Sequence, residues 1–378
     1  MLAVGSLVDE QILAEAKADF LIALARKGET IEEIAAFARE LRSKSIQPPL
    51  DAGTRAQEIL DVCGTGGDHL NTFNISTTVA IIAAAAGVIV AKHGNRAITS
   101  QSGSADVLEA LGIRIDLAPE ETARWLREHH FAFFFAPKYH PAFKHIGPAR
   151  KLCAERGQRT IFNFLGPLLN PARPTAQLIG VPRPQLCEPI ARVLQSLGVR
   201  RGMVVSGAVE SKVRGPKSEV EPGGGRSLSR TTPLPSAINH QPSTIGNLDE
   251  FSTLGENTIA EFYQDRGFAV STLLPHHFPL QLATLDDLRG GDRQANAQVV
   301  RLLLAGQERG PKRDAVLLNA AAALFVAGKT NSLSAGWELA AELIDRGQAS
   351  AKLEELVTSS RSGSESRLQA AARRNSVA

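Results

Sequence analysis

The sequence predicts an α/β protein in which N-terminal helices precede a region with a largely parallel central sheet flanked by helices. Short apolar runs alternate with helical patterns through the middle of the chain, and such alternation is typical of sheets covered by helices. Apolar residues make up 43% of the 378 residues, which is enough for a sizeable core. Aromatic residues make up only 5%, and the abundance of alanine and glycine favours helices packed closely on a sheet.

The chain up to about residue 44 has helical periodicity. Gly28 is expected to end the first helix, and Thr30 with Glu33 forms a capping-box pattern at the start of the second. Residues 45–54 contain two prolines and a glycine, which predicts a linker into a different structure. The apolar face expected for the first helix consists of Leu13, Ala16, Phe20 and Leu24.

After this linker, strands and helices are expected in alternation. Residues 58–63 and 88–92 are short apolar runs typical of buried strands. Residues 75–87 and 104–112 have helical patterns that end at glycines. Later strands are expected at 131–137, 202–207 and 268–273, and later helices at 295–306 and 313–328.

Two segments lack a sustained apolar period. Residues 208–245 are rich in Gly, Pro, Ser and charge, and a loop of this length inside a compact domain is either functional or disordered. A harmless insertion, a lid and a partner-binding loop all fit this composition, and a long surface insertion has a small entropic cost. Residues 359–378 are predicted to form a solvated, disordered tail.

Charge and cysteine content exclude several classes of protein. The 42 basic and 39 acidic residues nearly cancel, so the overall charge does not indicate a nucleic-acid or membrane partner. The three cysteines are far apart and include no C-x-x-C pair, which predicts reduced thiols, a cytoplasmic location and no zinc cluster. No signal peptide is expected, and the longest apolar run, residues 79–91, is too short to span a bilayer.

The stretch "DVCGTGGDHLNTFNIST" follows the first expected strand. Gly64, Gly66 and Gly67 allow backbone N–H groups to face an anion, and residues 74–77 begin a helix whose free N–H groups favour negative charge. A tight turn followed by an ordinary helix cap is the alternative reading. Asp68 would repel a phosphate unless it met a cation or a sugar hydroxyl, so the loop indicates a phosphosugar with magnesium.

The next loops have the same character. Lys92 follows the second strand and offers a positive charge for phosphate, and Asn95 offers both a donor and an acceptor. Gly103 and Ser104 begin a further helix. Three consecutive loops therefore have the residue types of an anion site.

Several long motifs resemble those of the anthranilate phosphoribosyltransferase family of tryptophan biosynthesis. The similarity extends from the N-terminal helices to about residue 350. It implies a helical domain (residues 1–59, joined by helices from about 148–197) hinged to a larger α/β domain (residues 60–350), usually in a cytoplasmic homodimer paired through the helical domains. The motifs are "GTGGD", "TFNIST", "KHGNR", "GSADVLEALG", "RTIFNFLGPLLNP" and "LGENTIAEF".

The resemblance also implies the roles of individual residues. Gly64, Asn95 and Arg150 would bind anthranilate, and a guanidinium pairs well with its carboxylate. His140 would line the acceptor side. The residues implied for phosphoribosyl pyrophosphate (PRPP) are Gly64, Gly67, Asp68, Thr72, Asn74, Ile75, Ser76, Thr77, Lys92, His93, Gly94, Asn95, Arg96, Ala97, Ile98, Thr99, Ser100 and Ser104.

The implied metal site departs from the family pattern. The family has a histidine near the end of one strand and an Asp-Glu pair soon after it, whereas this chain has Ser206 in place of the histidine. The next Asp-Glu pair is Asp249–Glu250, beyond the 208–245 insert. With the hydroxyl of Ser76, this pair is expected to hold Mg²⁺, with two ions per subunit implied by the family.

The reaction implied is transfer of the phosphoribosyl group of PRPP to the amine of anthranilate, with release of pyrophosphate. We expect catalysis by positioning and by stabilisation of the leaving group, with no acid or base assigned; His93 and His140 are the candidates if a base is used. The alternatives are a nucleoside phosphorylase on the same fold, a catalytically altered paralogue with another acceptor, and a nucleic-acid-binding relative. The sequence leaves open whether an anthranilate synthase amidotransferase subunit associates with the chain.

Overall fold

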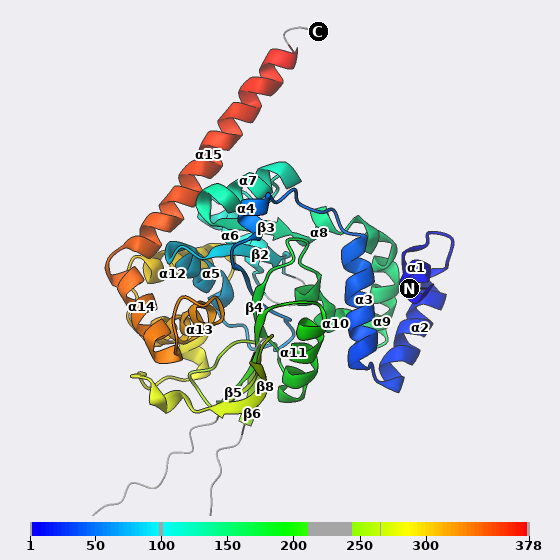
Figure 1. The fold of residues 1–378 in the computed structure, drawn as a ribbon, viewed down its shortest axis with the longest axis horizontal. Helices are drawn as coiled ribbons and strands as arrows, with labels where there is room; N and C mark the ends of the chain where they lie inside the picture. Colours follow the sequence, from blue (N-terminus) through cyan, green and yellow to red (C-terminus); the bar gives the residue numbers. More distant parts are fainter. Residues whose placement is uncertain (1, 98–100, 211–243, 265, 376–378) are drawn as a thin grey trace, which may run out of the picture.

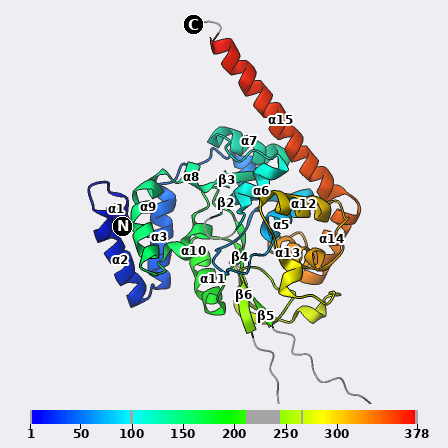
Figure 2. The ribbon, with the colours of Figure 1, turned by 180° about the vertical axis from the view of Figure 1, so that it is seen from behind.

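The computed structural model describes residues 2–97, 101–210, 244–264 and 266–375. An eight-stranded sheet runs through its centre in the order β3-β2-β1-β4-β5-β7-β8, and β6 also pairs with β5. Figure 1 and Figure 2 show helices on both sides of this sheet. The strands are β1 (Ile59–Gly64), β2 (Ile89–Gly94), β3 (Phe131–Phe135), β4 (Ala176–Gly180), β5 (Arg201–Glu210), β6 (Thr244–Leu248), β7 (Asn257–Tyr263) and β8 (Gly267–Leu273).

The predicted α/β fold with a mostly parallel sheet is confirmed. The pairs from β3 to β5 are all parallel, and only β6, β7 and β8 add antiparallel pairs. The strands β4, β6 and β7 were not predicted from the sequence. Because parallel strands end at the same edge of a sheet, the loops after β1, β2 and β4 open on one side.

Two groups of buried apolar residues form the cores. The larger group joins β1, β2 and β3 to α5, α6 and α12–α15, and the second joins α1–α3 and α9–α11 to residues of β1, β4, β5 and β7. The N-terminal helices therefore pack on helices from later in the chain, which Figure 1 shows at the right. The helices are α1 (Leu2–Val8), α2 (Ala14–Lys27), α3 (Ile31–Ser43), α4 (Ala52–Arg55), α5 (Ile75–Ala85), α6 (Ser104–Leu111), α7 (Pro119–His129), α8 (Ala136–Tyr139), α9 (Gly147–Glu155), α10 (Phe162–Leu165), α11 (Cys187–Ser196), α12 (Arg293–Leu304), α13 (Pro311–Val326), α14 (Leu333–Asp345) and α15 (Gln348–Asn375).

The face predicted to be buried on α2 is wrong except at Leu24. The helix buries Leu24 together with Ala18, Leu21 and Ile22, whereas Leu13 and Phe20 are 72% and 39% exposed. The sequence of α2 carries two apolar stripes, and the stripe with the smaller Ala18 packs against α9. The predicted capping box of Thr30 and Glu33 is present at the start of α3.

The chain also differs from expectation at its C-terminal end. Residues 359–375, predicted to be a disordered tail, continue α15, which extends away from the body of the molecule in Figure 1. This part of the sequence contains no proline and has a run of three alanines, both of which favour a helix, whereas Gly363 disfavours one. Within the described ranges, no helix is long and apolar enough to cross a membrane.

The predicted insert at 208–245 is shorter at both ends in the structure. Ala208–Glu210 completes β5 and pairs with β6, which begins at Thr244. The remainder, residues 211–243, lies outside the described residues.

Candidate active site

Three glycines make room for the segment 249–252 at the edge of the sheet. A methyl group on Gly180, at the end of β4, would lie 1.6 Å from the Asp249 carbonyl oxygen. A methyl group on Gly64, at the end of β1, would lie 2.1 Å from the Asp249 carboxylate, and one on Gly207 would lie 2.6 Å from the Glu250 carbonyl oxygen. The absence of side chains at three neighbouring strands thus allows the Asp-Glu pair to lie directly on the sheet edge.

The glycine loop after β1 reaches the same carboxylate. The Gly66 backbone N–H donates a hydrogen bond of 2.6 Å to Asp249 Oδ2, and Gly66 and Gly67 have φ angles of 75° and 85°. Glycine reaches this left-handed region without strain, which a side chain would resist. The sequence predicted that an anion faces these N–H groups, and in the structure one of them already faces a protein carboxylate.

Three carboxylates, those of Asp68, Asp249 and Glu250, lie close together at this edge of the sheet. Burial raises the pKa of Asp249 well above its ordinary value, and the charges of Asp68 and Glu250 raise it further. Burial also raises the pKa of Glu250 to about 7, although Lys92 lowers it in part. Such a group of acids is electrostatically unfavourable on its own and fits a site for a cation.

The start of α5 and the end of β2 complete this group. The Ser76 backbone N–H donates to the Glu250 carboxylate. Lys92 is 1% exposed, and its ammonium donates to the Val62 carbonyl (2.7 Å) and to Ser76 Oγ (3.2 Å). The structure therefore brings together Ser76 from the first turn of α5, Glu250 from the segment after β6, and Lys92, which lies within β2 and not in the loop after it as predicted.

The loop after β2 does not offer the free positive charge that an anion site would be expected to have. The Arg96 guanidinium forms ion pairs with Asp106 (3.0 Å) and Glu109 (2.6 Å) of α6, so its charge is already compensated. The backbone N–H of Ala97 donates to Asp106 as well. The predicted ligands Ile98, Thr99 and Ser100 lie outside the described residues.

The helix starts place the other predicted PRPP residues. Asn74 precedes α5, and its amide bridges the Ser102 carbonyl and the side chain of Asn296.

Ile75 is buried in the core, so only its backbone is available to a ligand. Thr77 is fully buried, and its Oγ1 has no hydrogen-bond partner among the described residues. Thr72 pairs with Arg289, and Gly94 lies against Ser104.

Arg150 of α9 is a half-buried cation. Its guanidinium lies 5.4 Å from the ring centre of Phe162 and forms no salt bridge in the part of the chain that the structure describes. Burial lowers the pKa of Arg150, yet guanidinium remains charged at neutral pH. A planar cation beside an aromatic ring, with no acid partner among the described residues, fits an aromatic carboxylate.

Two buried histidines are paired at the end of β2. His93 Nε2 lies 3.1 Å from His140 Nε2. Burial lowers the pKa of His93 well below its ordinary value and that of His140 to about 4, with the charge of Arg42 adding to both shifts. Both rings are therefore neutral at neutral pH, and one donates a hydrogen bond to the other.

The C-terminal half of β2 is held by residues that were not predicted from the sequence. Asp61 is fully buried and accepts hydrogen bonds from the His93 backbone N–H (3.2 Å) and from Asn170 Nδ2 (2.8 Å). Asn170 Nδ2 also donates to the Ala91 carbonyl (2.7 Å). An acid within the apolar strand at 58–63 was the available signal, because a charge is seldom buried without partners.

The donor set fits Mg²⁺ that is shared with a substrate. No group of three or more His, Cys, Asp or Glu side chains among the described residues is arranged to hold a metal ion alone. Mg²⁺ commonly binds one or two carboxylates and completes its shell with water and phosphate oxygens. Asp249, Glu250 and the Ser76 hydroxyl supply such hard oxygen ligands.

Anion-binding loops, clustered carboxylates and a parallel sheet are together typical of a transferase that acts on a phosphorylated sugar. Residues 56–218 and 241–350 match the model of the glycosyl transferase family, a/b domain. The chain is 44% identical to an anthranilate phosphoribosyltransferase of Petrotoga mobilis, over 89% of this chain and 85% of that protein. It is 43% identical to one of Geobacter sulfurreducens, over 90% and 88% of the two chains.

Solved structures agree with these relatives. The anthranilate phosphoribosyltransferase of Thermus thermophilus is similar with a TM-score of 0.76 and 38% identity, over 95% of this chain and 93% of that chain. The enzyme of Saccharomyces cerevisiae in complex with PRPP and Mg has a TM-score of 0.75 and 25% identity, over 96% and 91%. The protein belongs to the anthranilate phosphoribosyltransferase family.

Proposed function

We propose that this protein transfers the 5-phosphoribosyl group of PRPP to the amine of anthranilate, giving N-(5-phosphoribosyl)anthranilate and pyrophosphate in tryptophan biosynthesis. The observation that carries the proposal is the convergence of the Asp249–Glu250 pair, the glycine loop after β1 and the start of α5 at one sheet edge. In a member of this family, these groups have the chemistry needed to bind a pyrophosphate donor.

Asp249, Glu250 and Ser76 would hold Mg²⁺, in two ions per subunit if the family pattern applies. When bound, Mg²⁺ would neutralise the gathered carboxylates and stabilise negative charge on the leaving pyrophosphate. Lys92 lies beside Glu250 and adds a fixed positive charge on the same side. The N–H groups of the glycine loop and of α5 would hold the donor, together with the remaining predicted PRPP residues.

Arg150 would orient the acceptor through its carboxylate, with Asn95 and Gly64 beside it. The amine lone pair of anthranilate forms the new bond to C1 of the ribose as the bond from C1 to the pyrophosphate oxygen breaks. The pyrophosphate leaves with that electron pair, and the nitrogen then loses a proton. Because an aromatic amine is already neutral, placement matters more than removal of a proton beforehand.

The histidine pair is suited to positioning. His140 has a pKa lowered to about 4, so it is a weak acceptor for a proton at neutral pH. His93 is hydrogen-bonded to it through Nε2. Two neutral rings would line the acceptor side and exclude water without taking part in proton transfer.

Closure between two domains would bring the substrates together. We assign residues 1–59 to the helical domain, joined by helices from about 148–197, and residues 60–350 to the α/β domain. Support comes from the packing of α2 on α9 and of α3 on α11, which joins helices from 148–197 to the N-terminal helices. Arg150 lies on α9, whereas Asp249 and Glu250 follow a strand of the sheet, so relative movement would change their separation.

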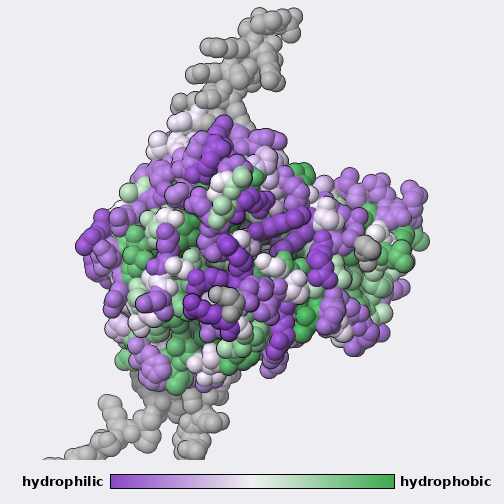
Figure 3. All heavy atoms as spheres, viewed as in Figure 1, coloured by the Kyte–Doolittle hydropathy of each residue, from purple (hydrophilic) through white to green (hydrophobic). Residues whose placement is uncertain are grey.

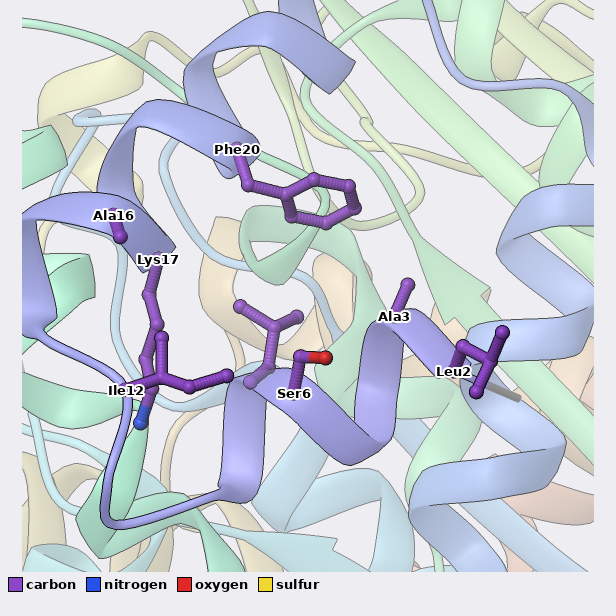
Figure 4. A pocket seen from close by; sticks show the side chains of 8 residues that line it. Leu2, Ala3, Ser6, Ile12, Ala16, Lys17 and Phe20 are labelled. Atoms are coloured by element: carbon purple, nitrogen blue, oxygen red, sulfur yellow. The ribbon is translucent and has the colours of Figure 1, made fainter.

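A homodimer through the helical domain is favoured by the outer surface of α1 and α2. A groove of about 340 Å³ lies there, lined mainly by apolar side chains, and Figure 4 shows Phe20 and Ile12 around it. Leu2 is 91% exposed at its rim. Figure 3 shows apolar residues among the hydrophilic ones on this side of the molecule. Association with an amidotransferase subunit and a cytoplasmic location stay predictions from the family resemblance.

The function is tested by product analysis. Purified protein with PRPP, anthranilate and Mg²⁺ should form N-(5-phosphoribosyl)anthranilate and pyrophosphate in equal amounts, measured by mass spectrometry and a pyrophosphate assay. The double variant D249N/E250Q should form neither product above background. Activity only with a nucleoside and inorganic phosphate would instead identify a phosphorylase and contradict the proposal.

A further inference from the structure

The backbone that follows Glu250 is held by the side chains of two buried asparagines. We propose that Asn319 and Asn257 are positioning residues that fix the carboxylates of Asp249 and Glu250 for metal binding. This inference rests on the proposed function, because it assigns a role in presenting the metal ligands. Neither asparagine was singled out in the sequence.

Asn319 acts from α13. Its Oδ1 accepts a hydrogen bond from the Phe251 backbone N–H, and its Nδ2 donates to the Phe251 carbonyl, both at 2.9 Å. Nδ2 also donates to the Ala315 carbonyl of its own helix (2.9 Å). The side-chain amide thus pairs with both backbone polar groups of one residue, as a neighbouring strand would.

Asn257 repeats this arrangement at the next residue. Its Oδ1 accepts from the Ser252 backbone N–H at 2.7 Å, and its Nδ2 donates to the Ser252 carbonyl at 2.9 Å. Asn257 begins β7 and is fully buried, and Asn319 is 1% exposed. Two successive residues therefore have both backbone polar groups satisfied by a buried amide.

The position of these bonds connects them to the carboxylates. The Phe251 N–H belongs to the peptide group that it shares with Glu250, so the bond to Asn319 fixes the backbone immediately after that carboxylate. At the strand ends, Gly180 and Gly207 let the backbone of Asp249 and Glu250 lie against the sheet. The segment is thus held by the strand ends and by the two amides.

Burial of an asparagine costs free energy, and the packing of α13 alone does not require a polar residue. Asn319 stands in a helix whose neighbouring residues are alanine, leucine and valine, nearly all of them buried. A buried amide is unfavourable unless all its polar atoms are paired, and removal of one partner leaves the other polar groups unsatisfied. A polar residue at this position is therefore explained by the loop that it holds.

The test compares metal binding with stability. Asn319→Leu keeps a similar volume and removes all three hydrogen bonds. Leu324→Ala on the same helix is the matched control, because this leucine is fully buried and its apolar side chain offers no hydrogen bond to the 249–252 segment. Mn²⁺ binding is measured by electron paramagnetic resonance with PRPP present and anthranilate absent. Loss of a group that supports metal ligands costs about 10–100-fold in affinity, so we expect at least a tenfold weaker Mn²⁺ affinity for Asn319→Leu and no change for Leu324→Ala.

Asn257→Leu is the second variant, and it should also weaken Mn²⁺ binding. It tests the inference on its own if Asn319→Leu does not fold. Unchanged Mn²⁺ affinity in a folded variant, with thermal stability lowered as in Leu324→Ala, would show a purely structural role and overturn the inference. Wild-type protein that bound no Mn²⁺ would overturn the proposed metal site itself. These two failures are distinguishable because the second appears before any substitution is made.

Discussion

Replacement of Gly180 by alanine should disable the site through backbone displacement alone. The added methyl group would lie 1.6 Å from the Asp249 carbonyl oxygen, whereas real contacts of this kind are essentially never under 3.0 Å. The Asp249 backbone would therefore have to move by at least about 1.4 Å, the difference between these two distances. A misplacement of about 1 Å costs on the order of 100-fold in rate, so we expect kcat/KM to fall by about 100-fold or more.

The assay is the loss of anthranilate fluorescence with PRPP at a series of Mg²⁺ concentrations, with thermal unfolding measured in parallel. Gly5→Ala is the control, because a methyl group there would meet no atom within 4 Å. Gly180→Ala should lower the rate and raise the half-saturating Mg²⁺ concentration, while Gly5→Ala should change neither. A Gly180→Ala variant with a rate within twofold of the wild type would refute the view that this glycine makes room for the metal ligands.

The acceptor site, the acid pair and the outer helical surface each give a further prediction. Arg150→Lys should raise the KM for anthranilate by about 10-fold or more with little change for PRPP, since a lysine loses the bidentate contact worth about 1.5–3 kcal/mol; equal effects on both substrates would remove the assigned role. Because the pKa of Glu250 is raised to about 7, protons should compete with the metal, and the half-saturating Mg²⁺ concentration should rise as the pH falls through 7. The raised pKa also means that the folded, metal-free protein binds a proton on Glu250 more tightly than the unfolded chain does. Its free energy of unfolding should therefore decrease as the pH rises from 4.5 through about 7. A free energy of unfolding that did not change over this pH range would contradict the raised pKa. If the homodimer proposed above forms through α1 and α2, Phe20→Asp should give a monomer in light scattering where the wild type gives a dimer; equal masses for the two proteins would contradict the proposed contact.

The sequence was sufficient for the fold where local signals agreed. The glycine-ended strands β1 and β2 and the helices after them were predicted because the apolar period changed at each glycine. Gly112, in the left-handed conformation, ends α6 as expected. The buried face of α2 was predicted correctly only at Leu24, because two apolar stripes on one helix are distinguished only by the partner that packs against them.

The candidate site was predictable only in part for a related reason. Lys92 and the Asp249–Glu250 pair stand in recognisable motifs, and the structure places them together. The contributions of Gly180, Asn319 and Asn257 depend on contacts between segments far apart in the chain. No local pattern specifies such contacts, although a lone asparagine in a buried helix is a signal that polar partners must be near.

The most direct test of the central claim is anthranilate fluorescence over time with purified protein, PRPP and Mg²⁺, alongside a sample treated with EDTA. The account predicts a loss of fluorescence that requires both PRPP and Mg²⁺. Unchanged fluorescence in a folded protein that still binds PRPP would contradict it, and would mean that the acceptor has changed or that catalysis has been lost.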